Sequence, residues 1–113
     1  MARRAHLVIR QVPGEGSDVT ISVSGELDLS TIEALAGQVD TQLHGAVDAL
    51  TLDLHDLAFM DSTGLRLLIE LADRARQEEW RLKLIRPSHE AAARVLRITG
   101  ADRALPFERG NTS

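Results

Sequence analysis

An α/β fold with one mixed or parallel sheet and helices mainly on one face is the class that this sequence predicts. Segments with apolar residues at every second position alternate with segments whose apolar residues recur every three to four positions. Strands joined through helices are parallel because the crossovers are right-handed. Strands covered on both faces are continuously apolar, whereas these strands alternate, so one face of the sheet should be exposed to solvent. The expected order is ββαβαβαβ, in a single domain of residues 1–113 with a core of about 6–108.

The first two strands are predicted on either side of a loop at residues 13–18. The run Leu7-Val8-Ile9 is apolar, and after the loop Val19, Ile21 and Val23 alternate with polar residues. The loop itself, Pro-Gly-Glu-Gly-Ser-Asp, is composed of turn-forming residues. We therefore expect the chain to open with a hairpin-like pair of strands.

The first helix is predicted from about Thr31 to His44. Its apolar residues follow one helical face: Ile32, Leu35, Ala36, Val39 and Leu43. Ser30 followed three residues later by Glu33 is typical of a capping box, in which each side chain satisfies a backbone N–H at the helix start. Gly45 is placed to end the helix in a left-handed conformation.

Two further strands enclose a second helix. The leucines of residues 50–54 alternate with polar residues, and so do those of residues 82–84, which predicts a strand at each place. The helix between them begins near Leu65, and Glu70 and Arg74 form an i,i+4 pair of opposite charge. Its predicted core face contains Leu65, Leu68, Ile69, Ala72 and Ala75.

A third helix and a last strand complete the predicted fold. Pro87-Ser88 opens this helix, and Gly100 ends it. Its inward residues are Ala92, Val95 and Leu96. A short final strand is expected near Leu105-Pro106-Phe107.

Composition excludes several classes of function. With 113 residues and 43% hydrophobic residues the chain can bury a core without staples, and the absence of cysteine excludes disulfides and thiolate sites. A net charge of −4, one Trp and no Tyr argue against nucleic-acid binding. No apolar run approaches the ~18 residues of a spanning helix, and no apolar signal-peptide segment follows the basic N-terminus. The expectation is a cytoplasmic protein without membrane insertion.

The most informative segment is residues 53–65, where a strand leaves the sheet and turns into the second helix. Ligands and partners of open α/β sheets meet the carboxyl ends of strands, and helix N-termini there favour negative charge. Ser62 lies at such a terminus. Purely structural roles are open at this point: Asp61 or Ser62 caps the helix, Gly64 lets the turn run close to the sheet, and Phe59-Met60 fills the core.

Two motifs in the chain resemble the anti-sigma-factor antagonist family, whose members are single STAS domains. They are Gly25-Glu26-Leu27-Asp28 and Phe59-Met60-Asp61-Ser62-Thr63-Gly64-Leu65, and the resemblance extends over about Leu7 to Phe107. It implies a non-enzymatic phosphoprotein that binds an anti-sigma factor, itself a serine kinase, and so releases a sigma factor in a partner-switching system of transcription regulation, as in stress response or sporulation.

The resemblance also implies the switch and its participants. The phosphorylated hydroxyl follows the motif aspartate directly, which places it at Ser62, and a metal-dependent serine phosphatase restores the active form. No metal or cofactor of its own is expected, because ATP belongs to the partner kinase. The expected partner-binding residues are Asp28, Thr31, Asp61, Ser62, Thr63, Gly64, Arg66 and Leu67.

Some of these residues have structural alternatives. Leu67 lies off the inward arc of the helical wheel, which suggests a contact with the partner, although such a leucine is usually incidental. Asp28 and Thr31 serve equally well as helix-start residues. Arg66 stands where the family commonly has a small residue, and pairing with Glu70 is its alternative role.

Other functions fit the sequence less well. A serine hydrolase elbow would need glycine where Met60 stands, and alternation along a strand splits His55, Asp53 and Asp56 between faces, which disfavours a metal site. The main alternative is a STAS scaffold or an accessory subunit of a signalling complex or membrane transporter, because fold alone does not separate these roles. A scaffold would be expected to carry longer extensions, so we favour a free-standing, monomeric antagonist.

Overall fold

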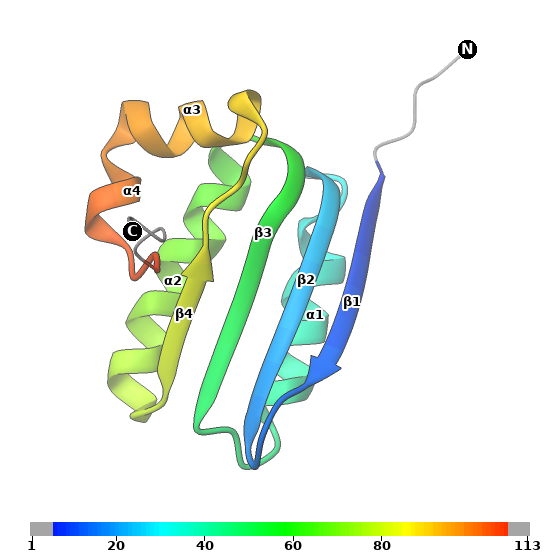
Figure 1. Ribbon diagram of the computed structural model, residues 1–113, viewed down its shortest axis with the longest axis vertical. Coiled ribbons are helices and arrows are strands. Elements are labelled where there is room, and N and C mark those ends of the chain that lie inside the picture. The colour runs from blue at the N-terminus through cyan, green and yellow to red at the C-terminus, as the bar shows by residue number, and fades with distance from the viewer. Residues whose placement is uncertain (1–5, 109–113) are drawn as a thin grey trace.

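The computed structural model describes residues 6–108, in which four strands form one sheet with the order β1-β2-β3-β4 (Figure 1). β1 (Leu7–Pro13) is antiparallel to β2 (Asp18–Leu27). β3 (Ala49–Met60) is parallel both to β2 and to β4 (Arg81–Ile85). The predicted hairpin opening and the parallel crossovers are confirmed.

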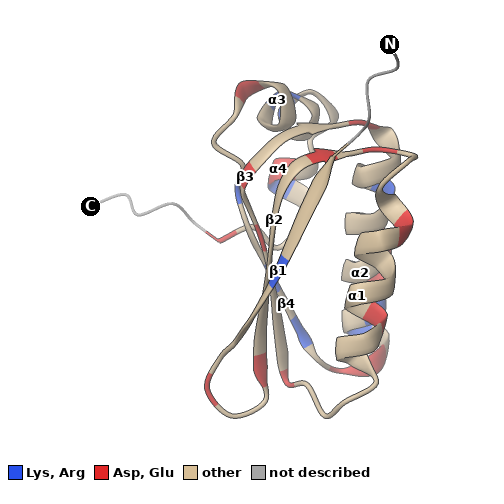
Figure 2. Cartoon of the chain, turned by 90° about the vertical axis from the view of Figure 1, so that its right-hand side faces the viewer, with Lys and Arg blue, Asp and Glu red and all other residues tan. Residues whose placement is uncertain are grey.

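Two long helices cover one face of the sheet. α1 (Ile32–Leu43) and α2 (Ser62–Glu78) lie side by side on that face, and most of the opposite face is open (Figure 2). α3 (Glu90–Thr99) and the short α4 (Ala101–Ala104) lie near the end of the sheet where β3 finishes (Figure 1). This arrangement confirms the predicted fold class.

β3 is longer than its alternating leucines indicated. Leu50, Leu52 and Leu54 are fully buried, as predicted, but two register shifts against β2 follow them. Each shift gives β3 an extra residue, so the inward face resumes at Leu57 and Met60 instead of at every second position. The bulges hide the rest of the strand from a search for period-two alternation.

The buried face of α2 is rotated from the predicted one. Leu67 is only 8% exposed and lines a small cavity together with Ala36 and Val39 of α1, whereas Ile69 is 45% exposed. The prediction failed because α2 packs against α1 as well as against the sheet, which buries a different stripe of side chains. The buried residues are Gly64, Leu67, Leu68, Leu71, Ala72 and Ala75.

The ion pair predicted within α2 is replaced by one between helices. The Arg74 guanidinium donates to Asp40 of α1 at 2.8 Å and to Glu78 at 3.5 Å. These hydrogen bonds raise the pKa of Arg74, with the Asp40 bond as the main cause. Arg74 therefore joins the two helices instead of pairing with Glu70.

The predicted capping box and left-handed end of α1 are wrong. Thr31 is the N-cap residue but makes no side-chain capping bond, and Ser30 bonds to Asp28 instead. The helix ends at His44 in a right-handed conformation, and Gly45 has no positive φ. By contrast, Gly100 ends α3 with a φ of 80°, as predicted.

The last predicted strand is reduced to a single bridge. After α4, which the sequence did not indicate, Phe107 forms an isolated parallel bridge with Leu84. The Leu84 N–H donates to Pro106 O at 3.0 Å, and the Glu108 N–H donates to Leu84 O at 2.7 Å. Pro106 has no N–H to donate, which limits how far this pairing can extend.

Candidate functional site

The two sequence motifs meet at one end of the sheet. Leu27 of β2 pairs with Met60 of β3, and the Asp61 N–H donates to Leu27 O at 3.3 Å. A Cβ on Gly64 would lie 2.9 Å from Leu27 Cδ2 and 2.9 Å from Met60 Cγ. Glycine is therefore needed for the first turn of α2 to sit this close to the two strand ends.

Asp61 caps α2 and leaves Ser62 on the surface. The Asp61 Oδ1 accepts hydrogen bonds from the N–H of Thr63 at 2.9 Å and of Gly64 at 3.4 Å. Ser62 is the first residue of the helix, and its side chain is exposed. The two capping roles left open by the sequence are thus decided in favour of Asp61, so the Ser62 hydroxyl is available to a partner.

A second polar loop connects β2 to α1. The Asp28 Oδ1 accepts from the Ser30 N–H at 2.9 Å and from the Ser30 hydroxyl at 2.7 Å. The Asp28 N–H donates to Thr31 Oγ1 at 3.0 Å, and that hydroxyl donates to Glu26 O at 2.8 Å. The hydroxyl of Ser30 is the main cause that lowers the pKa of the Asp28 carboxyl, which keeps this side chain ionised.

The loop geometry separates the two residues predicted here. Thr31 is buried, at 8% exposed, and its hydroxyl is used inside the loop, which is the helix-start role that the sequence left open. Asp28 is half-buried and carries the negative charge of the loop. Only Asp28 of this pair offers a charged group to a partner.

The other predicted contact residues fall into two groups. Arg66 is exposed and Thr63 is half-buried, so both remain accessible. Gly64 and Leu67 are buried. Leu67 belongs to the core face of α2, contrary to the prediction, so its predicted contact with a partner has no support from exposure.

Two apolar residues of the site were missed. Leu29, directly after Asp28, is 78% exposed, and Phe59, expected to fill the core, is 42% exposed. Met60, by contrast, is fully buried, as expected. An apolar residue such as Leu29 between polar turn residues, outside any helical or strand period, is the signal that could have identified the first of them.

Ser62 and Arg66 present their side chains at the surface of the site. Among residues 6–108 no hydrogen bond joins Ser62 to a histidine or a carboxylate, and no cluster of metal-ligating side chains occurs. His55 Nδ1 lies 3.1 Å from Asp56 Oδ1 on the exposed part of β3. A phosphate on Ser62 would sit at the positive end of the α2 dipole, where negative charge is stabilised.

Comparison with known families decides what kind of domain this is. A family model described as "Mlab, STAS domain" matches residues 10–106, which is most of the chain. This chain belongs to the STAS domain family. No match was found among curated protein sequences. Within residues 6–108 of the STAS domain, no helix has the length and hydropathy needed to cross a membrane.

Solved structures of anti-sigma factor antagonists share the fold of this STAS domain. An antagonist from Mycobacterium paratuberculosis matches with a TM-score of 0.76 and 23% identity, over 98% of this chain and 92% of that one. The antagonist SpoIIAA in its unphosphorylated form matches with a TM-score of 0.73 and 23% identity, over 91% and 90% of the two chains. The phosphorylated form of SpoIIAA, a Bacillus cell fate determinant, matches with a TM-score of 0.67, also at 23% identity, over 91% and 93%.

Proposed function

We propose that this STAS domain is an anti-sigma factor antagonist that binds an anti-sigma factor kinase and is switched off by phosphorylation of Ser62. The observation that carries the proposal is the position of Ser62, exposed as the first residue of α2 while Asp61 alone caps the helix. The hydroxyl is then free to meet a kinase without loss of the cap. A phosphatase that removes the phosphate would complete the cycle.

Phosphorylation at this position should change the surface and leave the fold intact. A phosphate adds a charge of about −1.5 to −2 and, at a helix N-terminus, is stabilised by the helix dipole. The structures of SpoIIAA in both forms are consistent with a fold that tolerates such a change. The energetic effect therefore falls on the partner contact.

The surroundings of Ser62 explain why that contact would weaken. The ionised Asp28 lies in the loop after β2, next to the end of β3 that leads into Ser62, and the chain already carries a net charge of −4. A partner surface that fits the neutral hydroxyl of Ser62 would meet added bulk and like charge. Each ~1.4 kcal/mol of lost binding weakens affinity about tenfold, so a few such contacts make a switch.

A scaffold or an accessory subunit of a membrane transporter is the second candidate. The matched family model is described as "Mlab, STAS domain". The fold is compatible both with a sigma-factor switch and with a scaffold or accessory subunit. Such a subunit would hold its partner whatever the state of Ser62. Dependence of binding on Ser62 therefore separates the two candidates.

The test is a capture of partners from lysate of the native host with wild type, Ser62→Ala and Ser62→Asp. The antagonist account expects Ser62→Ala to retain a kinase-type partner that Ser62→Asp loses. The phosphatase is expected as a separate partner, not in one complex with the kinase. A matched control is Thr41→Asp, which adds the same charge on α1 about 15 Å along the helix from its start. Equal capture by all variants, or capture of transporter subunits, would overturn the proposal, provided circular dichroism shows equal folding.

A further inference from the structure

Arg66 lies one helical turn after Ser62 on α2, and the side chains of both residues are exposed. Residues four apart on a helix share one face, with their Cβ atoms ~5–6 Å apart. Long side chains on a helix point back towards its start, so the side chain of Arg66 covers the turn that contains Ser62. A group attached to the Ser62 hydroxyl is therefore within reach of the Arg66 guanidinium.

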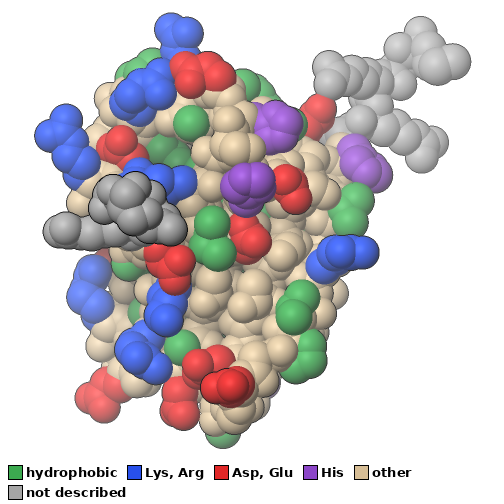
Figure 3. All heavy atoms as spheres, viewed as in Figure 1, with side chains coloured by type: hydrophobic (Ala, Val, Ile, Leu, Met, Phe, Trp, Pro, Cys, Tyr) green, Lys and Arg blue, Asp and Glu red, His purple; other side chains and the backbone are tan. Residues whose placement is uncertain are grey.

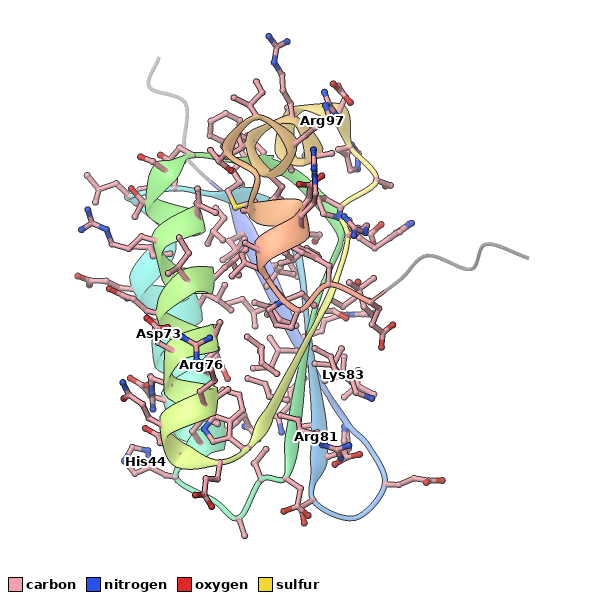
Figure 4. All side chains as sticks on the ribbon, turned by 90° about the vertical axis from the view of Figure 1, so that its left-hand side faces the viewer. His44, Asp73, Arg76, Arg81, Lys83 and Arg97 are labelled. Carbon is pink, nitrogen blue, oxygen red and sulfur yellow. The ribbon has the colours of Figure 1, made fainter. Side chains whose placement is uncertain are left out.

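The guanidinium of Arg66 is available for such a group. Within residues 6–108 it makes no ion pair and no hydrogen bond, so the pairing with Glu70 that the sequence left open is not formed. The other two cations of α2, Arg74 and Arg76, are each paired with a carboxylate. Figure 4 shows Arg76 beside its partner Asp73. Arg66 is thus the cation of α2 that has no partner among the described residues.

The elements that carry the two sequence motifs supply no other cation. Residues 11–65, which include β2, α1, β3 and the loops between them, contain no Lys or Arg. On the face shown in Figure 3, Lys and Arg side chains gather over α3, α4 and β4. Of the cations on α3, Arg97 is paired with Glu90 at 2.7 Å and Arg94 is exposed. Arg66 is therefore the cation placed closest along the chain to Ser62.

A phosphate on Ser62 would have carboxylates as its other charged neighbours. Asp61 caps α2 directly before Ser62, and the ionised Asp28 lies in the loop after β2. Like charges disfavour the dianionic form of a phosphate, whereas a guanidinium binds that form through charge-assisted, often bidentate hydrogen bonds. An acidic group four residues before a basic one is also the more stable order on a helix.

We propose that Arg66 holds the phosphate of phosphorylated Ser62 in an ion pair across one turn of α2. This inference rests on the proposed function, because it concerns the phosphorylated state. In the unmodified protein the guanidinium is free to contact a partner, and after phosphorylation the phosphate occupies it. Phosphorylation therefore removes a cation from the partner surface at the same time as it adds bulk and negative charge.

The phosphate itself reports the ion pair. Protein with phosphoserine incorporated at position 62 during translation is titrated at low salt and followed by phosphorus NMR, with no kinase or partner present. Arg66 favours the dianion, so the second pKa of the phosphate should be about 0.2–0.7 lower in wild type than in Arg66→Gln, as for an exposed ion pair. Arg66→Lys should keep part of this difference, because an ammonium keeps the charge but lacks the planar fork. Added salt should reduce the difference.

Two further variants control for the loss of one positive charge. Arg76→Gln removes a charge ~21 Å along α2 from Ser62, and Arg94→Gln removes an exposed one from α3. Both should titrate like wild type. The proposal fails if Arg66→Gln leaves the pKa of the phosphate unchanged, or if either control raises it as much. Because no kinase takes part, that failure leaves the antagonist function standing, whereas equal capture of a partner by the Ser62 variants overturns that function whatever the titration shows.

Discussion

Two glycines in the two long helices allow the packing at the site to be weighed against helix propensity. Gly64 lies in the first turn of α2, where an added Cβ would come 2.9 Å from both Leu27 Cδ2 and Met60 Cγ. Gly37 lies within α1 and would meet nothing within 4 Å. Replacement by alanine removes backbone entropy from the unfolded chain in both cases, a gain of roughly 0.5–1 kcal/mol in a helix.

The steric cost falls on Gly64 alone. Leu27 and Met60 are fully buried, so they must shift within a packed core, and overpacking of this kind costs about 1–3 kcal/mol. Gly37→Ala should therefore raise the free energy of unfolding. The free energy of unfolding of Gly64→Ala should be about 1–3 kcal/mol lower than that of Gly37→Ala, because the entropy gain is the same in both variants.

Urea unfolding followed by circular dichroism measures both variants against wild type. The slope of the free energy with urea should stay unchanged, so that midpoints report stability alone. Equal stability of Gly64→Ala and Gly37→Ala would refute the close approach of α2 to the ends of β2 and β3, and with it the geometry that presents Ser62.

Three further predictions concern the surroundings of the site. Asp61→Ala should lower the free energy of unfolding by about 1 kcal/mol through loss of the cap, while Asp61→Asn should retain most of it, as thermal unfolding would show. A double-mutant cycle on Arg74 and Asp40 should give a coupling of about 0.2–1 kcal/mol that falls with added salt, because both side chains are partly exposed; a coupling independent of salt would contradict this. The bonds from Ser30 lower the pKa of Asp28, so their contribution to stability is present above the pKa of the unfolded chain and is lost as the pH falls through the lowered value in the folded protein. Ser30→Ala should therefore raise the pKa of Asp28 in an NMR titration of its carboxyl; an unchanged pKa would exclude Ser30 as the cause.

The order of the elements from β1 to α3 could be predicted from the sequence because each carries its own period. Alternation marked residues 50–54 and 82–84, and each lies within a strand. What failed depends on contacts between elements. The exposure of Ile69 and the burial of Leu67 follow from where α1 lies, and no pattern within α2 contains that information.

The site was predicted in the same uneven way. Asp61 and Ser62 were identified at the start of a helix because aspartate and serine favour such positions. Which of the two caps α2 was left open, since both side chains can accept the capping hydrogen bonds. The exposure of Phe59 was missed because the bulges in β3 shift its position relative to the core. The residue types at the helix start could be recognised in the sequence, whereas the register of β3 against β2 could not.

The central claim is that phosphate on Ser62 weakens partner binding without unfolding the domain. Once a kinase-type partner is captured, its affinity should be measured by calorimetry for the unmodified protein and for protein carrying phosphoserine at position 62, at equal ionic strength. The account predicts at least about tenfold weaker binding of the phosphorylated form, equivalent to ~1.4 kcal/mol, with an unchanged circular dichroism spectrum. Equal affinities of the two folded forms would contradict it.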